Sequence, residues 1–193
     1  MPDRILIING HPDPRPERFC AALCDAYAEG ADTPEREVRR LNVGEMDLKF
    51  VRTTEEFTTG TPEPSIRQAQ ELIRWADHVV IVHPLWLGGP PAMLKAFLEQ
   101  VFRYGFALSA PGDKTVGGLL GGRTARLIVT MGMPAAIYRL IFGQAGIRAE
   151  GQGVLSLCGF RPVRRSYIGM VEGSAAARRK WLEGVRGWGA RGV

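Results

Sequence analysis

The 193-residue sequence predicts an α/β fold in which helices cover both faces of a doubly wound parallel β-sheet. Short β-branched apolar runs alternate with segments whose apolar residues recur at helical spacing, and this alternation is typical of such folds. The run at 77–83, DHVVIVH, is apolar on both faces, as expected of a central parallel strand. We see no internal repeat, low-complexity tract or linker, so residues 1–193 are expected to form a single domain.

Five strands are expected from the apolar runs and the turn residues that bound them. The first run is short and β-branched and ends at Gly10, which indicates a buried strand. The second run, EVRRLN, is more polar and is expected nearer an edge of the sheet. The expected strands are residues 4–9, 37–42, 77–83, 125–130 and a stretch within 163–171.

Helices are expected between these strands. Phe19, Leu23 and Tyr27 form an apolar stripe at helical spacing, and Gly30 is expected to end that helix. Residues 43–63 lack a clear period and predict a long surface loop. The remaining helices are expected at 66–76, at 90–102, at 135–146, and around the stripe Trp181, Leu182, Val185 and Trp188.

The composition narrows the possible classes of protein. Apolar residues make up 45% of the chain and charged residues 23%, which is typical of a globular domain. The longest apolar stretches are too short to span a bilayer, and the run at 5–8 is too short for the core of a signal peptide. The odd count of three cysteines argues against a disulfide framework. We therefore expect a cytoplasmic protein that is not itself a membrane protein.

The net charge of +5 raises the question of nucleic-acid binding. The arginines are spread along the chain with acidic residues interleaved in most segments, and no aromatic-basic RNA motif is present. Nucleic acid is therefore not an expected partner. A positive field of this size also favours small anions such as phosphorylated cofactors.

Three predicted loops follow strand ends, at 10–18, 84–91 and 131–136. The first leads into the start of a helix, where unpaired N–H groups and the helix dipole attract an anion, and Arg15 and Arg18 add charged donors. The sequence lacks a Walker motif, and this loop lacks GxGxxG, which disfavours a triphosphate or a dinucleotide Rossmann site. A single phosphate or a pyrophosphate therefore remains as the anion expected to bind at this helix start.

The loop at 84–91, PLWLGGPP, combines an aromatic residue and apolar neighbours with two glycines. A flat apolar wall with exposed backbone groups suits a heteroaromatic ring, so we favour ligand contact for Trp86. The segment TMGMP at 130–134 offers further backbone donors, and Tyr138 is expected near the same edge of the sheet. His11, in the first loop, is also favoured as a functional residue.

In order and spacing, these segments resemble the flavodoxin-like NAD(P)H:quinone oxidoreductases, a family that includes flavoprotein subunits of bacterial potassium-efflux systems. The resemblance extends from Ile5 to about Val171. It implies a sheet with strand order 2-1-3-4-5, a flavin-binding domain, and a preference for FMN, with FAD as the alternative. The matching motifs are Gly10-His11, residues 77–84, Pro84-Leu85 with Gly89, Pro91-Ala92, Leu94-Lys95, Val101-Phe102, residues 105–107, Gly132 with Tyr138, and residues 158–160.

The resemblance implies roles for individual positions. His11 matches a histidine beside the flavin phosphate, residues 15–19 match the phosphate-binding turn, and Tyr138 matches the tyrosine that assists hydride transfer. The flavin-binding residues implied are His11, Arg15, Glu17, Arg18, Phe19, Pro84, Leu85, Trp86, Leu87, Thr130, Met131, Gly132, Met133 and Tyr138.

The sequence departs from the family pattern at the acceptor side. The phosphate turn often carries serine or asparagine, where this chain has residues 16–18, PER, so backbone N–H groups and arginine must bind more of the phosphate. Gln144 stands where the mammalian-type enzymes have a histidine, and Leu108 and Ala110 stand where they have tyrosines from the partner subunit. The acceptor pocket is therefore expected to differ.

The activity that the resemblance implies is hydride transfer from NAD(P)H, through the flavin, to a quinone or similar small electrophile by a ping-pong mechanism. An accessory flavoprotein subunit of a membrane transporter is the alternative, and a one-electron carrier is a third hypothesis. The resemblance also implies a homodimer with the flavin site at the interface, for which the apolar stripe on residues 90–104 is expected to offer surface.

Several residues are expected to be structural instead of functional. His78 begins a strand and is expected to be structural, whereas His83 is left open between a core residue and a functional one. Cys20 and Cys24 lack further ligands for a metal, so we expect no metal site there. Asp77 is expected to cap the preceding helix, and the residues expected in the core are Cys158, Trp181 and Trp188.

Overall fold

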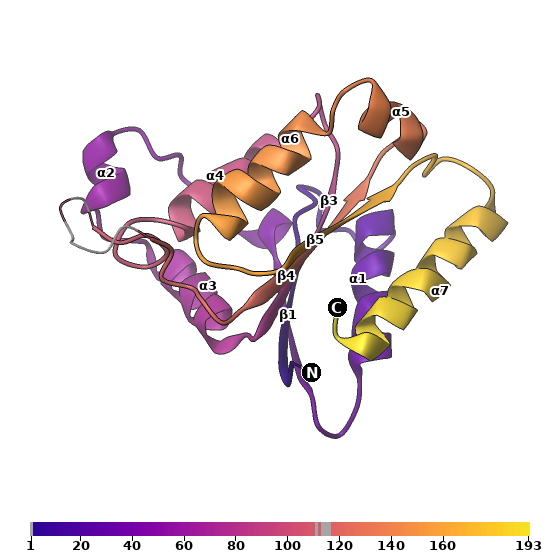
Figure 1. Cartoon of the computed structure of the whole chain (residues 1–193), viewed down its shortest axis with the longest axis horizontal. Coiled ribbons are helices and arrows are strands. Elements are labelled where there is room, and N and C mark those ends of the chain that lie inside the picture. Colours follow the sequence, from indigo (N-terminus) through magenta and orange to yellow (C-terminus); the bar gives the residue numbers. More distant parts are fainter. Residues whose placement is uncertain (1, 111, 113–116) are drawn as a thin grey trace.

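The computed structural model describes residues 2–110, 112 and 117–193, and it places five parallel strands in one sheet. The strand order is β2-β1-β3-β4-β5, with helices on both faces, as predicted (Figure 1). The strands are β1 (Arg4–Asn9), β2 (Glu37–Asn42), β3 (His78–Pro84), β4 (Thr124–Thr130) and β5 (Val163–Ile168). They lie where the apolar runs predicted them.

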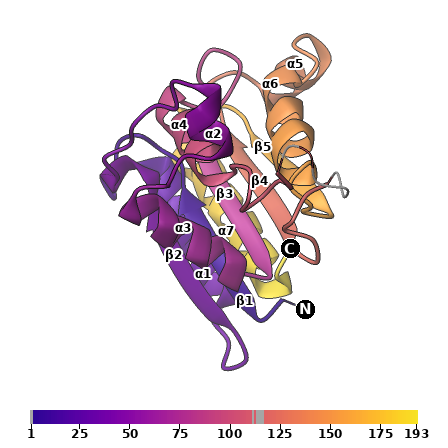
Figure 2. The same cartoon turned by 90° about the vertical axis from the view of Figure 1, so that its left-hand side faces the viewer.

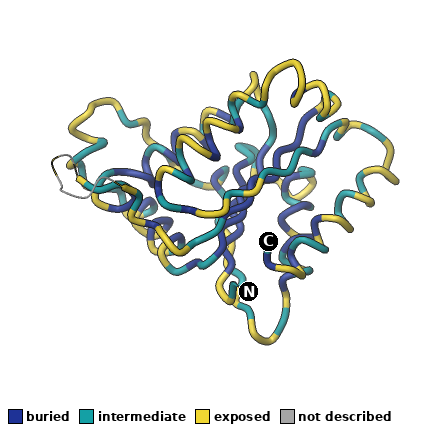
Figure 3. The backbone as a smooth tube through the Cα atoms, viewed as in Figure 1, coloured by how far each residue is buried: buried dark blue, intermediate teal, exposed yellow. Residues whose placement is uncertain are grey.

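Burial follows strand position in the sheet. Residues 78–83 of the central strand β3 are all buried, whereas β2 and β5 at the edges are largely half-exposed (Figure 3). The register aligns the carboxyl ends of the three inner strands: Asn9 of β1 pairs with Val82 of β3, and Pro84 of β3 pairs with Thr130 of β4. The loops that follow these strands therefore start at one edge of the sheet.

Two helical layers cover the sheet (Figures 1 and 2). On one face, α1 and α7 pack closely together over side chains such as Ile7, Val80 and Val82. On the other face, α3, α4 and the segment that begins with α6 cover Leu6, Val79 and neighbouring side chains. The helices are α1 (Phe19–Ala31), α2 (Thr54–Thr58), α3 (Pro64–Trp75), α4 (Ala92–Val101), α5 (Ala135–Leu140), α6 (Ala145–Arg148) and α7 (Ala175–Arg191), with a 3₁₀ turn η1 (Val43–Glu45) and a π-helix η2 (Ala149–Ser156).

The helical predictions need four corrections. The helix expected at 135–146 is two short helices, because Gly143 and Gln144 adopt left-handed φ angles of 60° and 57° and interrupt it. The chain then continues into η2, a π-helix that the sequence analysis did not predict. Gly30 lies inside α1, which ends at Ala31. The loop expected at 43–63 contains η1 and α2.

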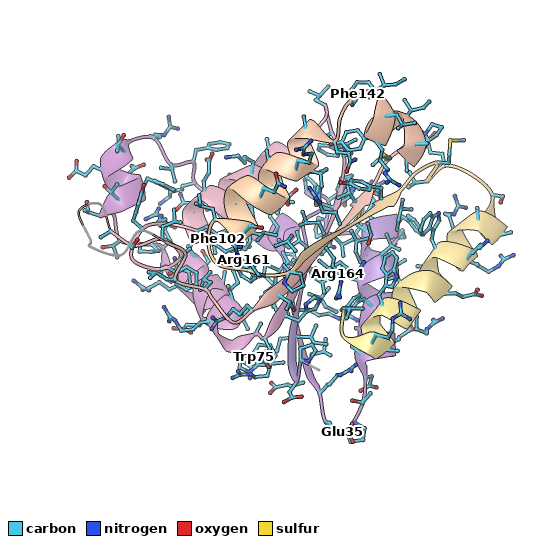
Figure 4. The ribbon with its side chains drawn as sticks, in the orientation of Figure 1. Glu35, Trp75, Phe102, Phe142, Arg161 and Arg164 are labelled. Atoms are coloured by element: carbon cyan, nitrogen blue, oxygen red, sulfur yellow. The ribbon has the colours of Figure 1, made fainter. Side chains whose placement is uncertain are left out.

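The apolar stripe on α4 does not provide a dimer surface. Leu94, Phe97 and Val101 are fully buried against the sheet, because their stripe faces the core of this chain. Several exposed apolar side chains lie instead at the carboxyl edge of the sheet, on and after α5. Leu140 is 85% exposed, and Phe142 projects from the turn after α5 (Figure 4).

The amino edge of the sheet is held by polar contacts. Asp77 accepts hydrogen bonds from the backbone N–H and the guanidinium of Arg4, so it anchors β1 instead of capping α3 as expected. The His78 Nδ1 atom lies 2.6 Å from the Thr124 hydroxyl, and burial lowers the pKa of His78 to about 4. His78 is structural, as predicted, and lies at the end of the sheet opposite the three loops.

The buried cysteines behave as small apolar residues. Cys20, Cys24 and Cys158 are free thiols in the core, and burial raises the pKa of Cys20 to about 11. Among the described residues, no helix is long and apolar enough to cross a lipid bilayer.

The contact between α1 and α7 depends on two glycines. A Cβ atom at Gly30 would lie 2.0 Å from the Arg186 carbonyl oxygen, and one at Gly189 would lie 2.1 Å from that of Tyr27. We expect Gly189→Ala to lower the free energy of unfolding by about 2–3 kcal/mol, because the two backbones must separate. Urea denaturation measures this change.

Gly184→Ala is the matched control on the same helix. A Cβ atom at Gly184 meets nothing within 4 Å, so alanine is expected to stabilise the protein by up to about 1 kcal/mol. Equal effects of the two substitutions would contradict close packing at Gly189.

Candidate functional site

The three loops predicted from the sequence meet at the carboxyl edge of β1, β3 and β4. The N–H of Gly10 donates to the carbonyl of Val82 at 2.8 Å, and the N–H of Leu85 donates to that of Thr130 at 2.7 Å. The rings of His11 and Trp86 lie 5.9 Å apart in an edge-on arrangement, which joins the first loop to the second. The edge between β1 and β3 is also where the strand order reverses, the usual ligand site of such sheets.

The first loop is organised by Asp13, which the sequence analysis did not select. Its carboxylate accepts hydrogen bonds from the guanidinium groups of Arg15 and Arg18, and the backbone N–H of Asp13 donates to Nδ1 of His11 at 3.0 Å. The two predicted phosphate-binding arginines are thus held together by one carboxylate. An acid two residues before one arginine and five before the other was the signal that could have identified it.

The start of α1 is open to an anion. Arg18 occupies the N-cap position without a side-chain hydrogen bond to the helix, and the first turn of the helix carries no acidic residue. The first N–H groups of a helix have no partner within it, and the helix dipole adds positive potential there. Arg15 and Glu17 are exposed in the same turn, whereas Phe19 packs partly against the core.

The second loop contains a tight turn that displays two apolar side chains. The N–H and C=O groups of Trp86 and Gly89 are reciprocally hydrogen-bonded, at 2.9 and 3.1 Å. Leu87 and Gly88 between them have φ angles of 49° and 85°, which matches the geometry of a type I′ turn. A left-handed leucine is strained, so the surroundings must hold this turn in place.

Tyr138 and Gly146 provide that support. The Tyr138 hydroxyl donates to the Gly88 carbonyl at 3.2 Å and accepts from the N–H of Ile147 at 3.4 Å. A Cβ atom at Gly146 would lie 2.0 Å from the same Gly88 oxygen, so α6 packs directly on the turn. The Tyr138 side chain is buried, and this burial raises the pKa of its hydroxyl.

The remaining predicted residues of the site differ widely in their exposure to solvent. Thr130 and Met131 are buried, and the Thr130 hydroxyl lies 3.6 Å from the Cys20 sulfur atom. Gly132 is exposed and Met133 is half-exposed. Pro84 and Leu85 are also half-exposed, whereas half of the Trp86 side chain and all of Leu87 face solvent.

The positions that depart from the family pattern have local partners. The Tyr167 hydroxyl donates to the amide oxygen of Gln144 at 2.8 Å, and the Tyr167 ring lies 5.9 Å from that of Tyr138. Leu108 packs against the core of its own chain.

The sequence analysis left His83 open and did not select Glu150, which lies against it beneath the second loop. Nε2 of His83 lies 3.1 Å from Oε2 of Glu150, and both side chains are almost completely inaccessible. Between residues 117 and 171, Glu150 is the only acidic residue in the sequence. A solitary acid in an apolar and basic stretch was a signal for a buried partner.

Together these features form a surface with two chemical characters. The start of α1 offers uncapped N–H groups and arginines, and the turn at 86–89 offers an apolar platform made by Trp86 and Leu87. This arrangement fits a planar heteroaromatic ligand that carries a phosphate. Within the described part of the chain, no three His, Cys, Asp or Glu side chains are grouped so as to hold a metal ion.

Comparison with curated proteins gives relatives over most of the chain. Human ribosyldihydronicotinamide dehydrogenase (quinone) is 30% identical over 149 residues, which cover 73% of this chain and 62% of the human protein. An uncharacterised NAD(P)H oxidoreductase of Haemophilus influenzae is 28% identical over 170 residues, covering 86% and 83%. The potassium-efflux ancillary protein KefG of Enterobacter is 40% identical over 74 residues, 38% of each chain. The chain spans 57% and 62% of the first two curated relatives that it matches.

Solved structures share the architecture. A Streptococcus mutans protein with 27% identity has a TM-score of 0.80, covering 97% of this chain and 99% of the other. An NAD(P)H:quinone oxidoreductase of Methanothermobacter marburgensis is 19% identical and has a TM-score of 0.82. The match covers 99% of this chain and 97% of the other. An FMN-dependent NADH-azoreductase of Bacillus anthracis, solved in complex with FMN, has a TM-score of 0.75. It is 15% identical, and the match covers 98% of each chain.

The sequence model that describes the flavodoxin-like fold matches residues 3–189, almost the whole chain. The sheet order, the open helix start and the turn at 86–89 agree with that match. The chain therefore belongs to the flavodoxin-like family.

Proposed function

We propose that the chain is a flavin-dependent NAD(P)H oxidoreductase that reduces a quinone or similar small electrophile. The observation that carries this proposal is the placement of an uncapped helix start beside an exposed apolar turn at the carboxyl edge of the sheet. The relatives named as quinone dehydrogenases and NAD(P)H oxidoreductases support it. A bound flavin would accept hydride from the nicotinamide and pass it to an acceptor that then occupies the same place, in a ping-pong sequence.

FMN is the proposed cofactor, with FAD as the alternative. The start of α1 offers one cluster of N–H groups, which suits a single terminal phosphate. The FMN complex of the azoreductase that shares the fold supports the same choice. Arg15 and Arg18 would share their charge between Asp13 and the phosphate.

The second and third loops would hold the flavin ring. Trp86 and Leu87 offer apolar contact to one face, and exposed backbone groups of the turn and of Gly132 offer hydrogen bonds to its polar edge. Tyr138 is the residue proposed to assist hydride transfer. Its hydroxyl proton is directed at the Gly88 carbonyl, so it holds that carbonyl in place.

We also propose a homodimer with the flavin site at the interface. The support is the exposed apolar group beside the site, where Leu140, Ile141 and Phe142 are 85%, 75% and 53% exposed. An accessory role at a membrane transporter has less support, because the match to KefG covers 38% of each chain.

Flavin uptake tests the proposed function directly. The purified protein is expected to bind FMN and to elute as a yellow complex at the mass of two chains. Size-exclusion chromatography with light scattering and absorbance in the blue measures both quantities. A colourless protein after incubation with FMN and with FAD would contradict the proposal, and a yellow complex of one chain would contradict the dimer alone.

Gly146→Ala tests whether the turn at 86–89 binds the flavin. A methyl group at Gly146 must displace the Gly88 carbonyl, so FMN is expected to bind at least tenfold more weakly. Gly153→Ala, in η2, is the matched control because a Cβ atom there meets nothing within 4 Å. Fluorescence titration measures the FMN affinity of the two variants. Equal affinities would exclude the turn at 86–89 as part of the flavin site.

Tyr138→Phe is expected to slow flavin reduction by NAD(P)H about tenfold, while FMN stays bound. The phenyl ring keeps its packing against Phe142, and the hydrogen bonds that the hydroxyl makes to Gly88 and Ile147 are lost. Tyr167→Phe, which loses its bond to Gln144, serves as the control. Stopped-flow absorbance gives the rates, and an unchanged rate in Tyr138→Phe would remove that tyrosine from the mechanism.

A further inference from the structure

His83 and Glu150 form a buried pair directly beneath the segment proposed to hold the flavin ring. His83 is in β3 next to Pro84, the first residue of that segment, and Glu150 is in η2. Their facing atoms, Nε2 and Oε2, are 3.1 Å apart, and the side chains are 0% and 2% exposed. The approach is off the line of a well-directed hydrogen bond, so the attraction is chiefly electrostatic.

The contacts of the imidazole determine where its protons lie. Nδ1 of His83 lies 2.9 Å from the Pro84 carbonyl oxygen, which can only accept, so Nδ1 carries a proton. Nε2 faces a carboxylate, which favours a second proton on the ring. Burial by itself opposes that charge, but the Glu150 carboxylate outweighs it, so the pKa of His83 is raised above its ordinary value.

The same strand contains a contrasting histidine. His78 is as deeply buried as His83, but it faces the Thr124 hydroxyl and lies near Arg126 and Arg164. Its pKa is lowered to about 4, first by burial and then by these arginines. His78, which faces no carboxylate and lies near two arginines, therefore has a lowered pKa, whereas the Glu150 carboxylate raises that of His83.

The surroundings of the pair come from several elements of the fold. Gly10, directly after β1, and Leu94 from α4 close one side, because a Cβ atom at Gly10 would lie 3.2 Å from the His83 Cβ atom and 2.7 Å from Leu94. From α5, Tyr138 has its pKa raised partly by the Glu150 carboxylate, and from β5 the Arg165 side chain lies beside Gly151, the neighbour of Glu150. The turn is therefore supported at both ends: His83 contacts Pro84, and Tyr138 contacts Gly88.

We propose that the His83 imidazolium and the Glu150 carboxylate are a positioning pair, which holds the start of the segment 84–89 and thereby sets the affinity and reduction potential of the flavin. This inference rests on the proposed function. Neither residue touches the ring. The pair acts through the Pro84 carbonyl, and its opposite charges cancel beneath the ring site.

The charge state of the pair is tested on the protein without flavin. Long-range ¹⁵N–¹H spectra of the imidazoles, recorded against pH, are expected to give His83 a midpoint above about 6.5 and His78 a midpoint near 4. In Glu150→Gln, which keeps the shape of the side chain, the His83 midpoint is expected to fall below about 6.5. A wild-type His83 midpoint below that of an ordinary histidine would overturn the proposal.

The role of the pair in flavin binding is tested by the FMN affinity and midpoint potential of three variants: His83→Gln, Glu150→Gln and the double variant. Each single variant is expected to bind FMN about tenfold more weakly, and the double variant no more weakly than His83→Gln. His83→Gln leaves the carboxylate unpaired, so it is expected to lower the midpoint potential by about 30 mV, a tenfold change for two electrons. The double variant is expected to return the potential toward the wild-type value.

His78→Gln is the matched control, because His78 is buried in the same strand at the opposite end of the sheet. Its FMN affinity is expected to stay within about twofold of wild type. The proposal that the two residues act as a pair would be overturned if their losses of FMN affinity were additive in the double variant. An unchanged midpoint potential in His83→Gln would overturn it as well. Failure of the wild-type protein to bind flavin would overturn the proposed function, and the imidazole titration would still decide the charge of the pair.

Discussion

The parallel pairing of β1, β3 and β4 is the constraint on which the candidate site depends. Because these strands run in the same direction and end in register, the loops after Asn9, Pro84 and Thr130 leave the sheet side by side. A parallel ladder needs a helix between successive strands, so each of these loops also leads into a helix or a helical turn. The start of α1 and the turn at 86–89 are close together for this reason.

Much of this framework could be predicted from the sequence. The three inner strands coincide with β-branched apolar runs, and DHVVIVH identified the central strand because a strand buried on both faces is mostly apolar. The loop proposed to hold the ring was also recognisable, since PLWLGGPP places an aromatic residue and two glycines after that strand. These features depend on residues that are neighbours in the sequence.

Features that depend on distant residues were not predictable in the same way. The stripe on α4 has helical spacing whichever surface it faces, so the pattern did not reveal that Phe97 and Val101 pack on their own sheet. The pairing of His83 with Glu150 joins residues 67 positions apart, and η2 had no periodic signal of its own. Asp13 lies close to Arg15 and Arg18 in the sequence. Its hydrogen bonds to both arginines, which partly neutralise their charge, could be recognised only from the structure.

The contact between Gly146 and the carbonyl of Gly88 has a consequence for how small molecules exchange at this edge. With the backbone of α6 pressed against the turn and Tyr138 bonded to the same oxygen, the turn has no space behind it into which it could swing. The turn can move away from its place only if α6 shifts with it. Under the proposed function, donor and acceptor would reach the ring from the solvent side of a turn that stays in place.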